Sequence, residues 1–240
     1  MRFARRPARL KQVLMLPFAQ SHLAAPDRVL LTFDDGPHPV HTPAVLERLR
    51  SASAIGAFFL IGERLAASPD LLRLIEGEGH FVGNHTFTHP QLGWSHLKFA
   101  RKEVERCQEL LSKGAEWFRP PYGRLTPGLW WAARRLGLKV VTWTLDSGDW
   151  QCRNAHDAKR CAAEVLKLVR PGDTILFHDN HEWIIPILNT VLASIPRLWL
   201  NSQNLTPWHG DEPEGGLLLG RGDLQRATVE PVRPHPSPTT

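Results

Sequence analysis

Cysteine is scarce in this sequence, and its arrangement excludes two common kinds of cysteine site. The 240 residues contain only Cys107, Cys152 and Cys161, and no two of them form a Cys-x-x-C pair. A zinc ribbon and a thioredoxin-like redox motif are therefore excluded. An odd number of cysteines provides no complete disulfide framework, so we expect free buried thiols. Cys152 and Cys161 could still form a disulfide if the protein is exported.

Long apolar segments are also missing. No apolar run reaches the roughly eighteen residues of a membrane-spanning helix, so the sequence predicts no membrane span. Residues 1–28 form a basic leader or arm, whose apolar part at 13–19 is short and contains Pro17. No convincing Ala-x-Ala cleavage site follows it. We therefore expect the leader to be retained and the protein to be cytoplasmic, with a periplasmic or secreted protein as the alternative.

Acidic residues are slightly outnumbered, and the imbalance is local. Lys and Arg total 29 against 24 Asp and Glu, a net charge of +5, and five of the basic residues lie among the first eleven. The rest of the chain is close to neutral, which argues against a nucleic-acid partner. Tyrosine occurs once, whereas tryptophan occurs nine times. We expect most tryptophans in the core, and any on loops would suit stacking against sugar rings.

Strand-like apolar runs alternate with helical periodicity through the middle of the chain. We expect strands at 29–33, 56–62, 80–83, 139–145, 174–177 and 197–200, and helices at 42–50, 69–77, around 104–111, 126–136, 157–169 and 183–195. Thr42 and Thr126 are the expected N-caps of two of these helices. Residues 117–123 are loop by composition. This order predicts an α/β fold with a parallel sheet and outer helices, most simply a barrel.

Composition divides the chain into three parts. The leader at 1–28 precedes a domain at 29–201, and a low-order tail follows at 202–240. The tail is rich in Gly, Pro and acidic residues at 207–216 and in Pro, Ser and Thr at 233–240. Such a composition buries too little apolar surface to order itself.

Two neighbouring carboxylates stand where the first expected strand stops. Asp34 and Asp35 follow the apolar run at 29–33 and precede Gly-Pro, a turn signal. In α/β proteins the carboxyl ends of parallel strands are where sites are built. His85 and His89 follow the third expected strand and are four residues apart, which suits one face of a turn. Two imidazoles and one carboxylate make a mononuclear zinc-type site with open positions.

Five short motifs follow one another along the chain. They are Thr32-Phe33-Asp34-Asp35-Gly36-Pro37, His85-Thr86-x-x-His89, Arg119-Pro120-Pro121-Tyr122, Asp149-Trp150 and Leu176-Phe177-His178. In these motifs the sequence resembles the polysaccharide deacetylases, the NodB-homology domain of carbohydrate esterase family four, and its compact length resembles their chitooligosaccharide deacetylases. The resemblance covers about residues 29–195. It implies a deformed (β/α) barrel of about seven parallel strands.

The resemblance also implies a metal centre with a base beside it. Asp35, His85 and His89 would bind one divalent ion, zinc first, with cobalt, nickel or manganese as alternatives. Asp34 would be the general base that takes a proton from water. Arg119 would position Asp34 and favour its ionised form.

The remaining motifs imply a proton donor and a pocket for the acetyl group. His178 would be the general acid for the leaving amine, with Asp149 as its partner. The backbone N–H of Tyr122 would hold the oxyanion. Trp150 and Leu176 would form the wall around the acetyl methyl.

We therefore expect a metal-dependent hydrolase that removes N-acetyl groups from poly- or oligosaccharides that contain N-acetylglucosamine. The enzymatic alternatives are O-deacetylation of xylan or another acetylated glycan and hydrolysis of a small amide. A carbohydrate-binding pseudoenzyme is the non-enzymatic alternative, although no ligand, base or acid of the motifs is lost. We expect a monomer. We expect His181 at the surface, with a position in the cleft as the alternative.

Overall fold

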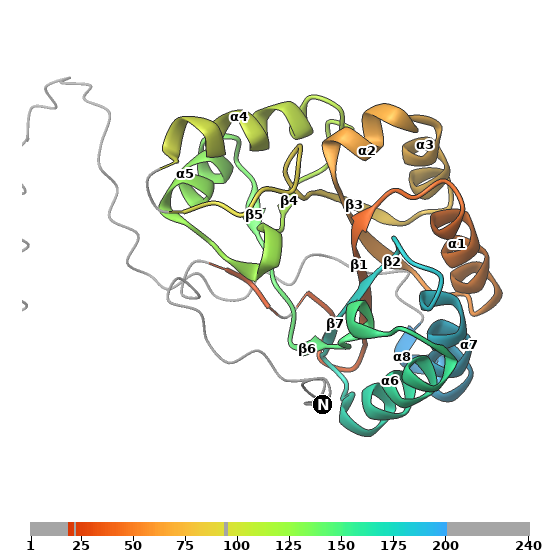
Figure 1. Ribbon diagram of the computed structural model, residues 1–240. Helices are drawn as coiled ribbons and strands as arrows, with labels where there is room; N and C mark the ends of the chain where they lie inside the picture. The colour runs from red at the N-terminus through yellow and green to blue at the C-terminus, as the bar shows by residue number, and fades with distance from the viewer. Residues whose placement is uncertain (1–18, 22, 94–95, 201–240) are drawn as a thin grey trace, which may run out of the picture. The chain divides into compact units, whose positions relative to one another are not determined.

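Seven parallel strands form the central sheet of the computed structural model, which describes residues 19–21, 23–93 and 96–200 (Figure 1). The strands are β1 (Leu30–Gly36), β2 (Gly56–Leu60), β3 (Phe81–Asn84), β4 (Trp117–Phe118), β5 (Lys139–Val140), β6 (Leu145–Asp146) and β7 (Thr174–His178). Their order across the sheet is β5-β4-β3-β2-β1-β7-β6, and each neighbouring pair is parallel. The expected deformed (β/α) barrel of about seven parallel strands is confirmed.

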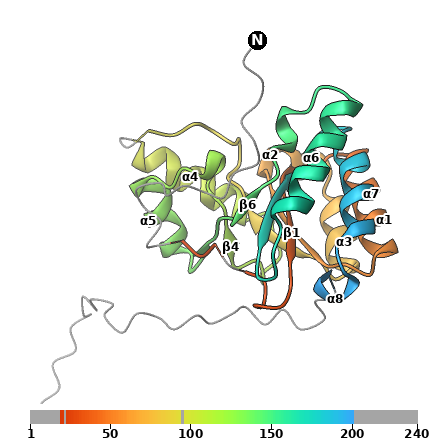
Figure 2. The same ribbon diagram turned by 90° about the horizontal axis from the view of Figure 1, so that it is seen from below.

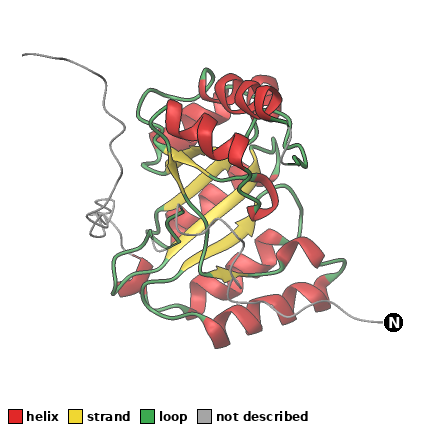
Figure 3. Ribbon diagram, turned by 90° about the vertical axis from the view of Figure 1, so that its left-hand side faces the viewer, coloured by secondary structure: helices red, strands yellow, loops and turns green. Residues whose placement is uncertain are grey.

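Helices flank the sheet on both sides (Figure 3). They are α1 (His41–Ser51), α2 (Gly62–Ala67), α3 (Asp70–Gly77), α4 (Leu97–Gln108), α5 (Pro127–Arg135), α6 (Ala155–Leu168), α7 (Ile184–Ser194) and α8 (Arg197–Leu200), with two short 3₁₀ turns, η2 (Pro121–Gly123) and η3 (Asp149–Gln151). Helices α4 and α5 pack on each other near β4, whereas α1, α3, α6 and α7 gather around β1 (Figure 2). No helix in the described ranges is long and apolar enough to cross a membrane.

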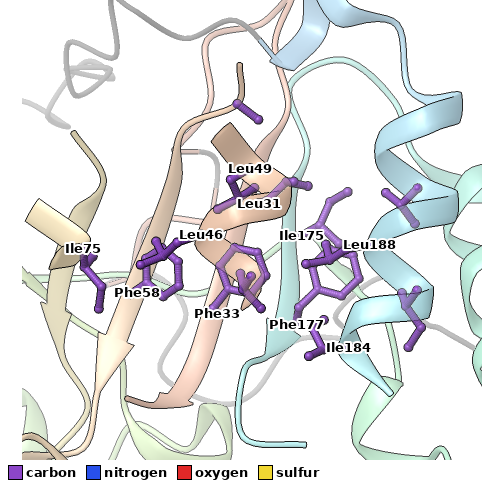
Figure 4. Close-up of a cluster of buried hydrophobic side chains, with 14 of the residues drawn as sticks. Leu31, Phe33, Leu46, Leu49, Phe58, Ile75, Ile175, Phe177, Ile184 and Leu188 are labelled. Carbon is purple, nitrogen blue, oxygen red and sulfur yellow. The ribbon is translucent and has the colours of Figure 1, made fainter. Parts of the chain in front are cut away.

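Alternation along β1 separates the hydrophobic core from the barrel interior. Leu31 and Phe33 belong to the cluster that packs against α1 and α7 (Figure 4). The Phe33 ring stacks on Phe58 of β2 at 4.9 Å and on Phe177 of β7 at 6.0 Å. Burying each such side chain contributes about 1.5–3 kcal/mol, so these rings help to hold the three strands together. Side chains on a strand alternate between its two faces, so Thr32 and Asp34 lie on the opposite face.

The expected strand at 139–145 is in fact two strands at opposite edges of the sheet. Residues 141–144 cross the gap between β5 and β6. On the way, the amide of Val141 donates to the carbonyl of Phe118 at 2.8 Å, and that of Thr144 donates to the carbonyl of Thr174 at 2.9 Å. A continuous strand was wrong because the chain must pass from the β4 edge to the β7 edge, and no single strand can pair with both.

Three local expectations also need correction. Residues 117–118, expected as loop, form β4 between β3 and β5. Residues 197–200, expected as a strand, form helix α8, since both sides of β1 are already paired with β2 and β7. Thr126 caps its helix as expected, accepting from the amide of Leu129 at 3.3 Å. Thr42 does not cap α1, because the helix begins one residue earlier, at His41; its hydroxyl accepts from the amide of His38 at 2.7 Å and donates to the carboxylate of Asp179.

Residues before β1 contact the barrel. Leu23 and Ala24 are buried in the interior cluster with Leu30 and Phe59. Gln20 pairs with the crossing segment, where its amide donates to the carbonyl of Val140 at 2.9 Å. The division at residue 28 stays a prediction. Residues 1–18 of the expected leader and the expected tail at 202–240 lie outside the described residues.

Candidate metal centre and active site

The carboxyl ends of the strands surround a cavity of about 370 Å³, a size typical of small-ligand pockets. Its lining includes eight of the ten site residues expected from the sequence: Asp34, Asp35, His85, His89, Tyr122, Trp150, Leu176 and His178. The other two, Arg119 and Asp149, are fully buried and bond to lining residues. The structure therefore brings all ten together, although they are spread over more than 140 positions of sequence.

Three side chains of the cavity form a donor set for a metal ion. The Nε2 atoms of His85 and His89 lie 3.4 Å and 3.2 Å from Oδ1 of Asp35. One ligand atom from each residue lies within 4.8 Å of the others. That Oδ1 atom is buried and has no hydrogen-bond partner among the described residues. Buried polar atoms are rarely left without a partner, so the arrangement fits a cation held between the three side chains.

Both histidines present Nε2 to this donor set. Nδ1 of His85 lies 2.7 Å from the carbonyl of Arg119. A carbonyl can only accept, so Nδ1 carries a hydrogen and Nε2 is the ring nitrogen that faces Asp35. Burial and the neighbouring His85 lower the pKa of His89 to about 4. Metal ligation requires neutral imidazoles, so His89 is in the required form at neutral pH.

A bulge lets the adjacent residues Asp34 and Asp35 face the same cavity. Simple alternation would point Asp35 to the helix side of the sheet. The register with β2 shifts between Asp34 and Gly36, and Asp35 has a φ of 67°. Bulges re-aim side chains in this way and are common beside active sites. Asn180 then holds Asp35 in place by donating from Nδ2 to Oδ2 at 3.1 Å.

Left-handed backbone is concentrated around the cavity. Within the described ranges, five non-glycine residues have positive φ, and Asp35, Thr86, His89 and Tyr122 are four of them. Each such conformation costs on the order of 1–3 kcal/mol and persists only where the surrounding structure enforces it. Gly123 continues the last of these turns with a φ of 64°, and a Cβ there would lie 2.7 Å from the ring of Trp143. The loops that carry the site are therefore held in a strained form.

Arg119 places a fixed positive charge behind Asp34. Its Nη1 donates to Oδ1 of Asp34 at 2.7 Å and to the hydroxyl of Thr32 at 2.8 Å. Nη2 donates to the carbonyl of Thr142 at 2.7 Å, and the guanidinium lies 3.9 Å from the ring centroid of Phe59. These contacts fix Oδ1 of Asp34 and leave Oδ2 directed at the donor set, 3.7 Å from Nε2 of His85.

A second buried carboxylate holds His178. Asp149 accepts from Nδ1 of His178 at 2.9 Å through Oδ1 and from the amide of His178 at 2.7 Å through Oδ2. Burial by itself lowers the pKa of His178. The charge and hydrogen bond of Asp149, with Asp34 and Asp35 nearby, outweigh burial and raise this pKa to about 10. His178 is therefore a cation at neutral pH, with its Nδ1 proton held by Asp149.

Aromatic side chains border the mouth of the cavity. Tyr122 and Trp150 are 58% and 53% exposed, although both line the cavity. The Tyr122 ring lies 4.7 Å from the ring of His89. Leu176 is buried and adds an apolar wall. Exposed aromatic faces beside an apolar wall are suited to a ligand with a sugar ring and a small apolar group.

The sequence analysis missed four residues that line the cavity, namely Trp143, Asp146, Asn180 and Gly123. The first two lie in or next to the segment that was expected as one strand, and Asn180 comes two residues after His178. His181 was expected at the surface but is half-buried, with Nε2 3.3 Å from Oδ2 of Asp149. Its spacing of three from His178 was the available signal.

Comparison with protein families yields one match, to the family described as polysaccharide deacetylase, over residues 24–141. The chain is 37% identical over 157 residues to a chitooligosaccharide deacetylase of Azorhizobium caulinodans, covering 63% of this chain and 73% of that protein. It is 32% identical over 172 residues to the peptidoglycan-N-acetylglucosamine deacetylase PgdA of Listeria monocytogenes, covering 70% of this chain. The matched region is only 36% of PgdA.

A solved structure shares the fold. The peptidoglycan deacetylase PdaC of Bacillus subtilis superposes with a TM-score of 0.63 at 30% identity, covering 70% of this chain and 82% of that chain. The chain is therefore similar in sequence and in fold to proteins named for the removal of acetyl groups from glycans.

Proposed function

The chain belongs to the polysaccharide deacetylase family, and from this premise we propose that its site hydrolyses the acetamido group of N-acetylglucosamine units in a poly- or oligosaccharide. Hydrolysis of N-acetyl groups is the activity of the family's named relatives, whose names include chitooligosaccharide and peptidoglycan substrates. N-acetylglucosamine is the sugar common to both. The reaction breaks the amide C–N bond with water and yields acetate and a free amino sugar.

Asp35, His85 and His89 would hold one divalent cation in this reaction. Two nitrogens and one carboxylate oxygen are a common zinc set that leaves positions open for water and substrate. Cobalt, nickel and manganese are accepted by similar donors. When bound, such an ion polarises the acetamido carbonyl and lowers the pKa of water from 15.7 towards about 7. The unpartnered Oδ1 of Asp35 supports this assignment.

Asp34 is the group best placed to take a proton from the attacking water. Arg119 occupies its Oδ1, so Oδ2 is the oxygen that faces the donor set. The guanidinium holds the carboxylate in one orientation. A positioned general base contributes about 10²–10⁴-fold to a rate.

His178 is the group best placed to protonate the leaving nitrogen. An amine leaves poorly unless it receives a proton, and His178 is cationic at neutral pH. Asp149 holds Nδ1, so the proton on Nε2 is the one available to substrate. The backbone N–H of Tyr122 would stabilise the oxyanion, and Trp150 with Leu176 would enclose the acetyl methyl.

One observation carries the proposal: a single cavity is lined by a metal donor set and by Asp34 and His178, each bonded to a buried side chain of opposite kind, Arg119 and Asp149. A pseudoenzyme of the same fold would lack at least one of these parts. The proposal is tested by acetate release from chito-oligomers, peptidoglycan and acetylated xylan, with metal-free protein and with protein reloaded with zinc.

We expect acetate from the two N-acetylated substrates, loss of activity on chelation and recovery with zinc. Activity that survives complete metal removal would contradict the metal centre. Acetate release from acetylated xylan alone would make the protein an ester hydrolase. Acetate release from none of the substrates would favour the carbohydrate-binding pseudoenzyme. His156→Gln, at an exposed position on α6, is the matched control for nonspecific metal binding.

A further inference from the structure

The buried carboxylate of Asp149 is shared between two imidazoles. Oδ1 accepts from Nδ1 of His178 and from the backbone amide of Trp150, both at 2.9 Å. Oδ2 accepts from the backbone amide of His178 at 2.7 Å and faces Nε2 of His181 at 3.3 Å. His181 follows β7 directly, whereas Asp149 lies in η3. The second imidazole has no part in the mechanism proposed above.

The hydrogen positions in this cluster follow from the partners. An ionised carboxylate only accepts, so the facing nitrogen of each imidazole carries a hydrogen. Nδ1 of His181 is buried and has no hydrogen-bond partner among the described residues. His181 therefore donates to Asp149 through Nε2.

Resting on the assignment of His178 as general acid, we propose that His181 is a positioning residue that holds Oδ2 of Asp149 and thereby aligns His178 for proton delivery. Asp149 fixes the ring of His178 through Oδ1. The rotation of the carboxylate decides where that ring points. Without His181, Oδ2 keeps only the hydrogen bond from the backbone amide of His178 at the end of β7. A carboxylate that accepts fewer hydrogen bonds also stabilises the cationic form of His178 more strongly. His178 would then release its proton less readily.

Other charged or titratable groups influence this cluster and stay the same in the test. They include Asp34 and Asp35 on β1, His89, Asp146 on β6, Asp179, Glu182, His41 on α1, and the thiols of Cys152 and Cys161. Of these, Asp34 and Asp35 act on His178, and the pKa of His41 is lowered by burial and by the nearby His181. Asp149 is the group to which His181 is hydrogen-bonded, so we expect the effect of replacing His181 on His178 to pass through Asp149.

A matched pair of substitutions separates the hydrogen bond from simple packing. His181→Gln keeps an N–H donor at about the reach of Nε2, whereas His181→Phe keeps the ring and removes the donor. We expect His181→Phe to lower kcat on a chito-oligomer about tenfold with little change in KM. On an aryl acetate, whose leaving group needs no proton, the loss should stay within about threefold. His181→Gln should recover most of the amide activity.

Three results would overturn the proposal. Equal losses on amide and ester would assign His181 a purely structural role. Unchanged amide turnover in His181→Phe would show that His181 has no role in the reaction. Failure of His181→Gln to recover activity would show that loss of the N–H donor is not the cause of the lower turnover. His156→Phe, an exposed histidine on α6, controls for the loss of an imidazole elsewhere.

A second measurement tests the hydrogen bond without turnover. In metal-free protein with ¹⁵N-labelled histidine, NMR should show a low-field Nδ1–H proton from His178 bonded to Asp149. We expect this signal to shift or exchange faster in His181→Phe and to persist in His181→Gln. An unchanged signal in His181→Phe would contradict the proposal even if the parent protein has no deacetylase activity. Failure of this inference and failure of the proposed function are therefore distinguishable.

Discussion

Asp34 and Asp149 are both buried, and each accepts hydrogen bonds from a basic side chain, but their partners differ in kind. Arg119 cannot be deprotonated in a protein, so it fixes Asp34 without offering a proton. His178 can release a proton, and Asp149 both orients it and keeps it charged. Two identical acids are thus prepared for opposite tasks by the residue beside each.

The two pairs also differ in how the fold supports them. Asp34 lies on β1, at the centre of the sheet, and Arg119 crosses the barrel interior to reach it. Asp149 lies on the short turn η3 and depends on three backbone or side-chain donors besides Nδ1 of His178. The first pair is held by the sheet itself. The second is held by a local network, which should be easier to perturb.

Removing the base should give the largest effect. We expect Asp34→Asn to lower kcat on a chito-oligomer by about 10²–10⁴-fold, since the amide cannot accept the proton of water. Metal content should stay at one ion per chain, because Asp35, His85 and His89 are intact. Elemental analysis and acetate release measure the two quantities. Retention of activity within a few-fold would show that Asp34 is not the base, and Asp70→Asn at an exposed site is the control.

Removing the acid should give a smaller effect that depends on the substrate. His178→Ala should lose at least about tenfold more kcat/KM on a chito-oligomer than on an aryl acetate, equal to about 1.4 kcal/mol of barrier. An aryl oxide leaves without a proton, whereas an amine does not. Both substrates should be measured in parent and variant at one pH. Equal losses would mean that His178 binds substrate or shapes the cavity and that the proton comes from elsewhere.

The dependence of stability on pH should show the smallest difference between the Asp34–Arg119 pair and the Asp149–His178 pair. The pKa of His178 is raised from its ordinary value of 6.5 to about 10 in the folded protein. Its pair with Asp149 therefore stabilises the fold fully below pH 6.5, and this contribution disappears as the pH rises through about 10. Arg119 stays protonated over that range, so its pair with Asp34 contributes no such change.

Urea unfolding of metal-free protein across that range measures the difference. The parent should lose free energy of unfolding towards alkaline pH, and His178→Gln should lose less because it has no proton to release. His156→Gln should follow the parent. Parallel curves for the parent and His178→Gln would show that the pair with Asp149 does not raise the pKa of His178.

Local sequence was enough to identify the parts that lie within a few residues of one another. The apolar runs before Asp34 and His85 were visible in the sequence. The expected strand before His85 ends at 83, one residue before the end of β3 at Asn84, whereas β1 continues past the expected end at 33 to Gly36. The N-cap at Thr126 could be predicted because its hydroxyl accepts from the amide of Leu129, only three residues away. The parallel sheet followed from the alternation of strands and helices. Composition and periodicity carry this information because each depends on neighbouring residues only.

The tertiary structure decided everything that joins distant segments. The bulge at Asp35 exists in the register with β2, and only that register turns both carboxylates to one cavity. The split of the 139–145 segment follows from closing a sheet whose edges lie far apart. His181 meets Asp149 across 32 residues, and Asn180 meets Asp35 across 145. The sequence by itself determined which side chains stand at the ends of strands, and the folded chain determined which of them touch, because contacts between remote segments depend on the path of the whole backbone.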